Sequence, residues 1–171
     1  MIGAMIDDAL RDMAARVLDA CRTRGLKVAT AESCTGGLVA GALTEVPGSS
    51  DVLDRGFVTY SNAAKEAMLG VPAATLERHG AVSRETAEAM AAGALAMSDA
   101  DLAVAITGVA GPGGGSAEKP IGLVHFAAAA RGGRRVHREK HYGDIGRSAV
   151  RAQSVAEALA MLELLAPSAR A

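Results

Sequence analysis

Apolar residues recur along the chain with the two periods that distinguish helices from strands. Between positions 6 and 24 they repeat on one face of a helix, whereas 102–106 is an unbroken apolar run, typical of a strand covered on both faces. Similar patterns predict further helices at 38–45, 63–69, 72–79, 84–97 and 147–165. They predict further strands at 27–31, 54–61, 121–130 and 135–142. This order of elements predicts an α/β fold.

The predicted elements fit one domain. The chain has 171 residues, enough to bury a core, and it contains no internal repeat and no linker. The last two strands, joined at Gly132 and Gly133, are expected to form an antiparallel hairpin, and residues 166–171 a frayed tail. We predict a single three-layer α/β/α domain over residues 1–171, with a mixed sheet of about five strands and helices on both faces.

Composition and charge exclude several classes of protein. The formal net charge is −1, and basic residues cluster only at 131–135, in a predicted hairpin turn, so a nucleic-acid-binding surface is not expected. We expect no signal peptide and no membrane span, because apolar runs are short. Two cysteines make no disulfide framework. We therefore predict a cytoplasmic protein, and the Ala- and Gly-rich helices suggest a homodimer.

A small polar cluster separates the first predicted strand from the helix that follows it. It holds two candidate nucleophiles, Ser33 and Cys34, and then Thr35 as a candidate N-cap. Gly36 and Gly37 complete the cluster and let the backbone approach a ligand closely. The cluster is either an active-site turn of an α/β protein or only a capped helix start.

Further polar side chains lie near the ends of predicted strands. Tyr60 ends one strand, Lys65 lies in the first turn of the next helix, and Thr107 and Gly108 begin a glycine-rich loop. A lysine in a first helical turn opposes the helix dipole, which indicates either a function or a solvated surface side chain. If the strands are parallel neighbours, these residues and Ser33 face one crevice at the carboxyl edge of the sheet.

The histidines do not suggest a metal site. All four, His79, His125, His137 and His141, lack cysteine or carboxylate partners at ligand spacing, so we expect no metal and no cofactor. A Ser-His-Asp arrangement is not evident, but a neutral lysine whose pKa is lowered by burial can activate a serine. Together these features point to acyl transfer on a small anionic molecule, whose identity they leave open.

Longer segments resemble a known family. The runs TAESCTGG, GSSDVLDRGFVTYSNAAKEAMLGV, HGAVSRETAEAMA, AITGVAGPGGGSAEKPIGLVHFA and GDIGRSAVR are together similar to the CinA carboxyl-terminal domain family. The similarity covers residues 8–165, nearly the whole chain. It resembles most the stand-alone nicotinamide-nucleotide amidases, which hydrolyse nicotinamide mononucleotide to nicotinate mononucleotide and ammonia in pyridine-nucleotide salvage. The resemblance implies this substrate and no cofactor.

The same motifs suggest roles for individual residues. Ser33 resembles the nucleophile of the family and Lys65 its partner base. Tyr60 and Thr107 resemble supporting site residues. Arg147 resembles an essential arginine, which we assign to the 5′-phosphate of the substrate.

Several alternatives stay open at this point. Cys34 competes with Ser33 as nucleophile, and Arg151 competes with Arg147 for the phosphate. The oxyanion would be bound by amides of the 34–37 turn or by those at Thr107 and Gly108. A non-catalytic nucleotide-binding module of the competence/damage-inducible type would use the same pocket.

Overall fold

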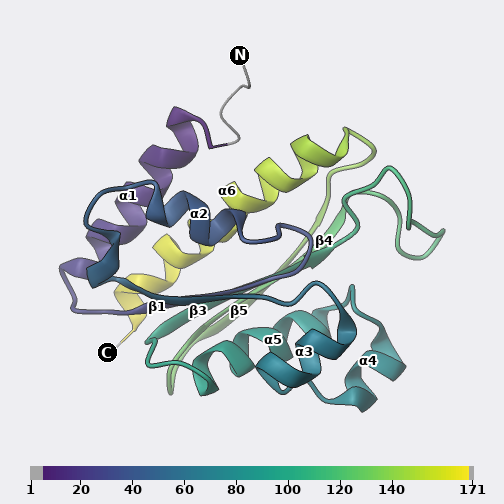
Figure 1. Cartoon of the computed structure of the whole chain (residues 1–171), viewed down its shortest axis with the longest axis horizontal. Helices are drawn as coiled ribbons and strands as arrows, with labels where there is room; N and C mark the ends of the chain where they lie inside the picture. The colour runs from purple at the N-terminus through teal and green to yellow at the C-terminus, as the bar shows by residue number, and fades with distance from the viewer. Residues whose placement is uncertain (1–5, 170–171) are drawn as a thin grey trace.

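The computed structural model describes residues 6–169, which are organised around one five-stranded sheet (Figure 1). The strands are β1 (Val28–Glu32), β2 (Leu53–Val58), β3 (Leu102–Gly108), β4 (Leu123–Ala130) and β5 (Arg135–His141). They lie side by side in the order β2-β1-β3-β4-β5. β1 is parallel to β2 and β3, whereas β4 is antiparallel to β3 and β5 is antiparallel to β4. The predicted mixed sheet and its hairpin are confirmed.

Helices cover both faces of this sheet (Figure 1). One face carries α1 (Asp8–Arg22), α2 (Leu38–Thr44) and α6 (Arg147–Leu165). The other carries α3 (Asn62–Leu69), α4 (Ala73–His79) and α5 (Arg84–Ala96). Two short 3-10 turns, η1 (Ser49–Asp51) and η2 (Ala166–Ser168), complete the described elements. The three layers agree with the predicted α/β/α arrangement.

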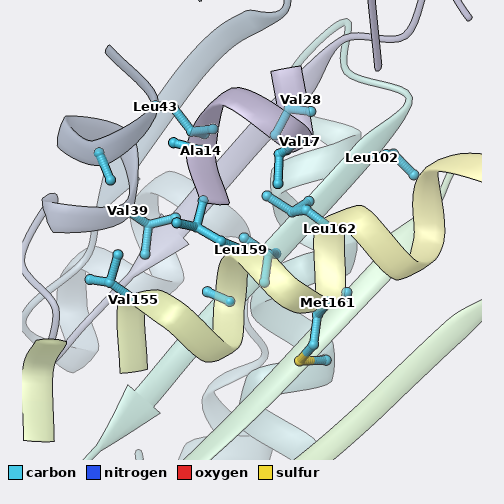
Figure 2. Packing of buried hydrophobic residues seen from close by; sticks show 14 of the residues in the cluster. Ala14, Val17, Val28, Val39, Leu43, Leu102, Val155, Leu159, Met161 and Leu162 are labelled. Atoms are coloured by element: carbon cyan, nitrogen blue, oxygen red, sulfur yellow. The ribbon is translucent and has the colours of Figure 1, made fainter. Parts of the chain in front are cut away.

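The sheet face toward α6 carries large apolar side chains. Leu102 and Phe126 point to this side and are fully buried. Val155, Leu159 and Leu162 of α6 are buried in the same cluster (Figure 2). Burying one such leucine contributes about 1.5–3 kcal/mol. This cluster holds α6 against the sheet, so that the first turns of the helix lie at the carboxyl edge of the parallel strands.

The face toward α5 is lined by much smaller side chains. Alternate positions of the three central strands are alanines on this side, namely Ala29, Ala31, Ala103, Ala105, Ala127 and Ala129. The buried face of α5 adds Ala87, Ala91 and Ala94. Since alanine extends little beyond its Cβ atom, the backbone of α5 can lie close to the sheet.

Gly93 carries this close packing from α5 to α3. A Cβ atom at Gly93 would overlap the carbonyl oxygen of Leu69, the last residue of α3. We expect Gly93→Ala to lower the free energy of unfolding by about 1–3 kcal/mol, because backbone rather than a flexible side chain must move. Gly41→Ala is the matched helical control, since its Cβ would meet only Ile6 Cδ1 at 3.7 Å.

Urea unfolding of both variants measures the difference. The control is expected to be neutral or to stabilise the protein by up to about 1 kcal/mol, because alanine is the better helix former. Equal losses of stability in the two variants would contradict the proposed contact between α3 and α5.

The carboxyl-terminal end differs from the prediction of a frayed tail over 166–171. Residues Ala166–Ser168 form η2, and Ala166 and Ala169 are buried against the core of α6. The apolar alanines supply the burial that orders this segment, while residues 170–171 lie outside the described part. Within residues 6–169, no helix combines the length and the apolar character needed to cross a membrane.

Candidate active site

A cavity opens at the sheet edge where the three parallel strands end. Ser33 directly follows β1, Thr59 follows β2, and Thr107 lies near the end of β3. The cavity encloses about 220 Å³. It is lined by Ser33, Cys34, Tyr60, Lys65, Ala81, Val82, Thr107, Gly108, Ala110 and Arg147. The parallel pairing of β1 with both neighbours therefore gathers side chains that are distant in sequence.

Lys65 lies beside the hydroxyl of Ser33. Its Nζ atom is 3.0 Å from Ser33 Oγ and donates to the carbonyl oxygen of Thr59 at 2.8 Å. Lys65 is only 1% exposed, so the alternative of a solvated surface lysine is wrong. The first turn of α3, capped by the Ser61 side chain, directs this lysine inward to the end of β1.

Burial lowers the pKa of Lys65 below the usual value of lysine, and the nearby thiol of Cys34 acts in the opposite direction. The two groups bonded to the amine are a hydroxyl and a carbonyl, neither of which carries a charge that would stabilise an ammonium. A neutral amine has a lone pair to accept the Ser33 proton. The distance between the two atoms is within the range that proton transfer requires.

The thiol of Cys34 lies in a different environment from the Ser33 hydroxyl. Cys34 is 6% exposed, and burial raises the pKa of its thiol to about 12. The thiolate is the nucleophilic form of cysteine, so a thiol with this pKa is almost entirely unreactive at neutral pH. The Lys65 amine is thus hydrogen-bonded to the Ser33 oxygen, whereas burial favours the protonated form of the Cys34 thiol.

Residues 33–37 connect β1 to α2 and are here called the nucleophile turn, because they include the two candidate nucleophiles, Ser33 and Cys34. The amide of Ser33 donates to the Ile106 carbonyl, and the amide of Gly36 donates to the Ser33 carbonyl, both at 3.0 Å. Gly36 and Gly37 have φ angles of 57° and 98°, a left-handed conformation that favours glycine. The turn can therefore reverse direction between strand and helix while keeping Ser33 at the cavity.

Helix α2 is capped in a way that the sequence did not suggest. Its N-cap residue is Gly37, not the predicted Thr35, whose hydroxyl is buried without a partner in the described part of the chain. The carboxylate of Glu32 instead accepts from the amides of Val39 at 2.8 Å and Ala40 at 3.1 Å. A carboxylate reaching from the preceding strand satisfies the free helix amides and complements the helix dipole.

Several predicted binding residues of the nucleophile turn do not reach the cavity. Thr35, Gly36 and Gly37 lie outside its lining, whereas Cys34 and Gly108 belong to it. The side chain of Thr35 points into the protein and is completely buried. None of these three residues therefore lines the cavity, and their role in substrate binding stays a prediction.

Tyr60 and Arg147 stand at the mouth of the cavity. Arg147 donates to the Tyr60 hydroxyl at 2.8 Å and to the Gly111 carbonyl at 2.9 Å. Tyr60 is 62% exposed, and Arg147 is also exposed. Arg147 is the first residue of α6, and its guanidinium places a positive charge at the mouth of the cavity, where an anionic part of a ligand would enter.

Arg151, one turn further along α6, contacts a different structure. Its guanidinium donates to the carbonyl oxygens of Cys34 at 3.1 Å and Thr35 at 3.2 Å. It does not line the cavity. The two arginines therefore have different surroundings: Arg147 lines the cavity, and Arg151 contacts the backbone of the turn outside the cavity lining.

Thr107 and two short apolar segments form a further part of the cavity wall. The Thr107 hydroxyl donates to the Ala81 carbonyl at 2.7 Å, and Thr107 is 1% exposed. Ala81, Val82 and Ala110 also line the cavity, although nothing in the sequence marked them as site residues. They are small apolar residues in loops, and only the tertiary fold reveals that they face the cavity.

The histidines lie away from this cavity. His125 Nδ1 is 3.0 Å from His137 Nε2, and the two rings stack between β4 and β5. His141 bonds Glu139 instead. Within residues 6–169 no group of three potential ligands is arranged to hold a metal ion.

Comparison with known proteins places this geometry in a family. The model of the CinA C-terminal domain matches residues 10–166. The nicotinamide-nucleotide amidohydrolase PncC of Escherichia coli (strain K12) is 52% identical over 159 residues, which cover 92% of this chain and 95% of that protein. A CinA-like protein of Synechococcus sp. (strain RCC307) is also 52% identical, but the match covers only 37% of its length.

Solved structures agree with the sequence comparison. The competence/damage inducible protein CihA of Agrobacterium tumefaciens superposes with a TM-score of 0.92 at 58% sequence identity, covering 93% of this chain and 96% of that one. A CinA superfamily protein of Klebsiella pneumoniae superposes with a TM-score of 0.87 at 38% identity, covering 93% and 98%. On the strength of the matched domain and of these relatives, the chain belongs to the CinA C-terminal domain family.

Proposed function

We propose that the protein is an amidase that hydrolyses nicotinamide mononucleotide to nicotinate mononucleotide and ammonia. The observation that carries this proposal is the buried amine of Lys65 at 3.0 Å from the Ser33 hydroxyl. This pair is suited to forming an acyl-enzyme from a carboxamide. Relatives that match nearly their whole length bear the name nicotinamide-nucleotide amidohydrolase, which supports a nucleotide as the amide-bearing substrate.

The proposed reaction begins with the neutral amine of Lys65. It takes the Ser33 proton while Ser33 Oγ bonds to the carboxamide carbon, and the carbonyl π electrons move to oxygen. The resulting tetrahedral intermediate collapses, and the Lys65 ammonium gives the proton to the departing nitrogen as ammonia leaves. Water then attacks the acyl carbon with Lys65 as base, which releases the nicotinate product and restores the Ser33 hydroxyl.

Other residues of the cavity have supporting roles in this proposal. The amide of Cys34, which directly follows the nucleophile, is the first candidate to bind the oxyanion. Arg147 supplies the charge for the 5′-phosphate, and Tyr60 holds its guanidinium in place. Thr107, fixed by Ala81, shapes the wall against which the carboxamide lies.

Ammonia release from nicotinamide mononucleotide tests the proposal directly. Purified protein treated with a chelator is expected to release one ammonia per nucleotide and to produce nicotinate mononucleotide, because none of the proposed steps uses a metal. Coupled ammonia detection with chromatography of the product measures both. Binding of the nucleotide without ammonia release would instead support a non-catalytic nucleotide-binding module.

The domain organisation, the oligomeric state and the cellular location of the protein are further parts of the proposal. We propose that the chain forms a single domain, since one sheet with its two helical layers includes elements from residue 8 to residue 168. A homodimer and a cytoplasmic location are further predictions from the sequence. Light scattering of the purified protein measures the first of them, and cell fractionation measures the second.

A further inference from the structure

Arg151 contacts the nucleophile turn but does not line the cavity. Its Nε donates to the Cys34 carbonyl and its Nη2 to the Thr35 carbonyl, at 3.1 and 3.2 Å. The residue is half-buried, and its helix α6 is anchored by the large-residue core. Two consecutive peptide groups of the turn are thereby tied to a rigid element.

These contacts lead through the backbone to the Cys34 amide. In a trans peptide the carbonyl and the N–H point in opposite directions. The peptide that presents its Thr35 oxygen to Arg151 therefore presents its other end, the Gly36 N–H, to the Ser33 carbonyl at 3.0 Å. That carbonyl shares a peptide group with the Cys34 N–H. Arg151 is thus linked to this N–H by two hydrogen bonds and two peptide groups.

We propose that Arg151 is a positioning residue that orients and polarises the Cys34 amide for binding the oxyanion. A guanidinium at one end of a hydrogen-bonded chain draws electron density through each peptide, which makes the last N–H a stronger donor. The left-handed φ of Gly36 lets the turn adopt the required path. The proposal rests on the proposed acyl transfer at Ser33, but not on which amide is the substrate.

This role differs from that of a phosphate ligand in what it affects. A residue that acts on the oxyanion contributes mainly in the transition state, so its loss lowers kcat and leaves KM nearly unchanged. A residue that binds the phosphate contributes already in the bound substrate. Its loss raises KM and removes the preference for nicotinamide mononucleotide over the riboside, which lacks the phosphate.

The test measures how fast Ser33 reacts with a fluorophosphonate, followed by intact mass. Ser33 Oγ bonds to phosphorus, fluoride leaves, and the serine proton passes to Lys65, so the probe reports on nucleophile and oxyanion site without any nucleotide. Arg151→Ala is expected to slow labelling roughly 10- to 100-fold. Its kcat for nicotinamide mononucleotide is expected to fall by a similar factor, with KM changed by less than about threefold.

Arg16→Ala is the matched control. Arg16 also contacts α6, through an ion pair with Glu163 at 3.3 Å, but it is largely exposed and lies outside the cavity lining. Its labelling rate and kinetics are expected to equal those of the wild type. Arg147→Ala serves as the comparison for phosphate binding, with KM raised and the preference over the riboside lost.

Each outcome decides the proposal. Wild-type labelling of a folded Arg151→Ala protein overturns it, as does a raised KM with loss of the preference over the riboside. If Arg151→Ala does not fold, Arg151→Lys decides. Lysine has one donating nitrogen in place of the two that contact the Cys34 and Thr35 carbonyls. Slower labelling of this variant therefore supports the proposal, and wild-type labelling overturns it. If the wild type is labelled at Ser33 but releases no ammonia from the nucleotide, the proposed substrate fails while the labelling comparison still tests Arg151.

Discussion

Ser33→Ala is expected to lower kcat for nicotinamide mononucleotide by roughly 10³- to 10⁶-fold while leaving the fold intact, as is found when a catalytic serine is removed. The Lys65 amine has two hydrogen-bond partners in the described part of the chain, the Ser33 hydroxyl at 3.0 Å and the Thr59 carbonyl. Of these two, only the hydroxyl can act as a nucleophile, so its removal should stop the reaction. Ammonia release measures the loss, and circular dichroism with thermal unfolding verifies that the protein is folded.

Cys34→Ala is the control for this prediction, because Cys34 is the neighbouring rival nucleophile. The substitution keeps the backbone amide and removes only a thiol whose pKa is raised by burial to about 12. The variant is expected to retain turnover within about tenfold of the wild type, and the wild type to resist iodoacetamide. An inactive Cys34→Ala variant together with an active Ser33→Ala variant would identify the Cys34 thiol, and not the Ser33 hydroxyl, as the nucleophile.

Lys65→Met is expected to lower kcat by about 10²–10⁴-fold with a smaller change in KM, because it removes the general base and keeps a side chain of similar length. In the wild type kcat should rise with pH through the pKa of Lys65 in the enzyme–substrate complex, since only the neutral amine accepts the Ser33 proton. Methionine cannot titrate, so the residual rate of the variant should lose this dependence. An unchanged rate would remove Lys65 from the mechanism.

The same substitution is expected to change how stability depends on pH. Burial lowers the pKa of Lys65 in the folded protein, so the unfolded chain binds more protons between that pKa and the value of about 10.4 for an exposed lysine. The free energy of unfolding of the wild type therefore rises with pH across this window. Lys65→Met removes that rise. The stability of the variant relative to the wild type should therefore decline as the pH approaches about 10.4, the ordinary pKa of lysine.

Urea unfolding at several pH values measures this relative stability.

The double variant Ser33→Ala/Lys65→Met provides a further control on the mechanism. Residues that act as one unit are not additive, so the double variant should be about as slow as Ser33→Ala alone. A further multiplicative loss in the double variant would mean that the two residues act in separate steps.

Patterns in the sequence were sufficient for most of the fold. Apolar periodicity placed every strand and helix of the sheet layers, and the predicted 147–165 range of the last helix agrees with Arg147–Leu165. The prediction of a frayed end was wrong for residues 166–169, because the burial of Ala166 depends on α1 and α6 meeting there. Local polarity and sequence position could not reveal that contact.

Several residues of the cavity could be predicted from their place in the sequence, either near a strand end or in the first turn of a helix. Ser33 and Thr107 follow directly from the parallel strands, and Lys65 from its unfavourable place in a first helical turn. The cap of α2 was assigned to Thr35, but Glu32 supplies it from the preceding strand. Such a contact depends on the path of the turn in space, as do the different hydrogen-bond partners of Arg147 and Arg151.

The contrast between the two faces of the sheet has a consequence for how the family can vary. On the α6 face, large side chains can exchange volume with one another, so repacking variants can keep the helix in place. On the α5 face, the strands present alanines and Gly93 lies close to the backbone of Leu69, so less side-chain volume can be redistributed. Lys65, the proposed base, belongs to α3, which packs against α5 on this closely packed face. A saturation library should therefore yield many active variants with substitutions on the α6 face and few on the α5 face, although both faces are buried.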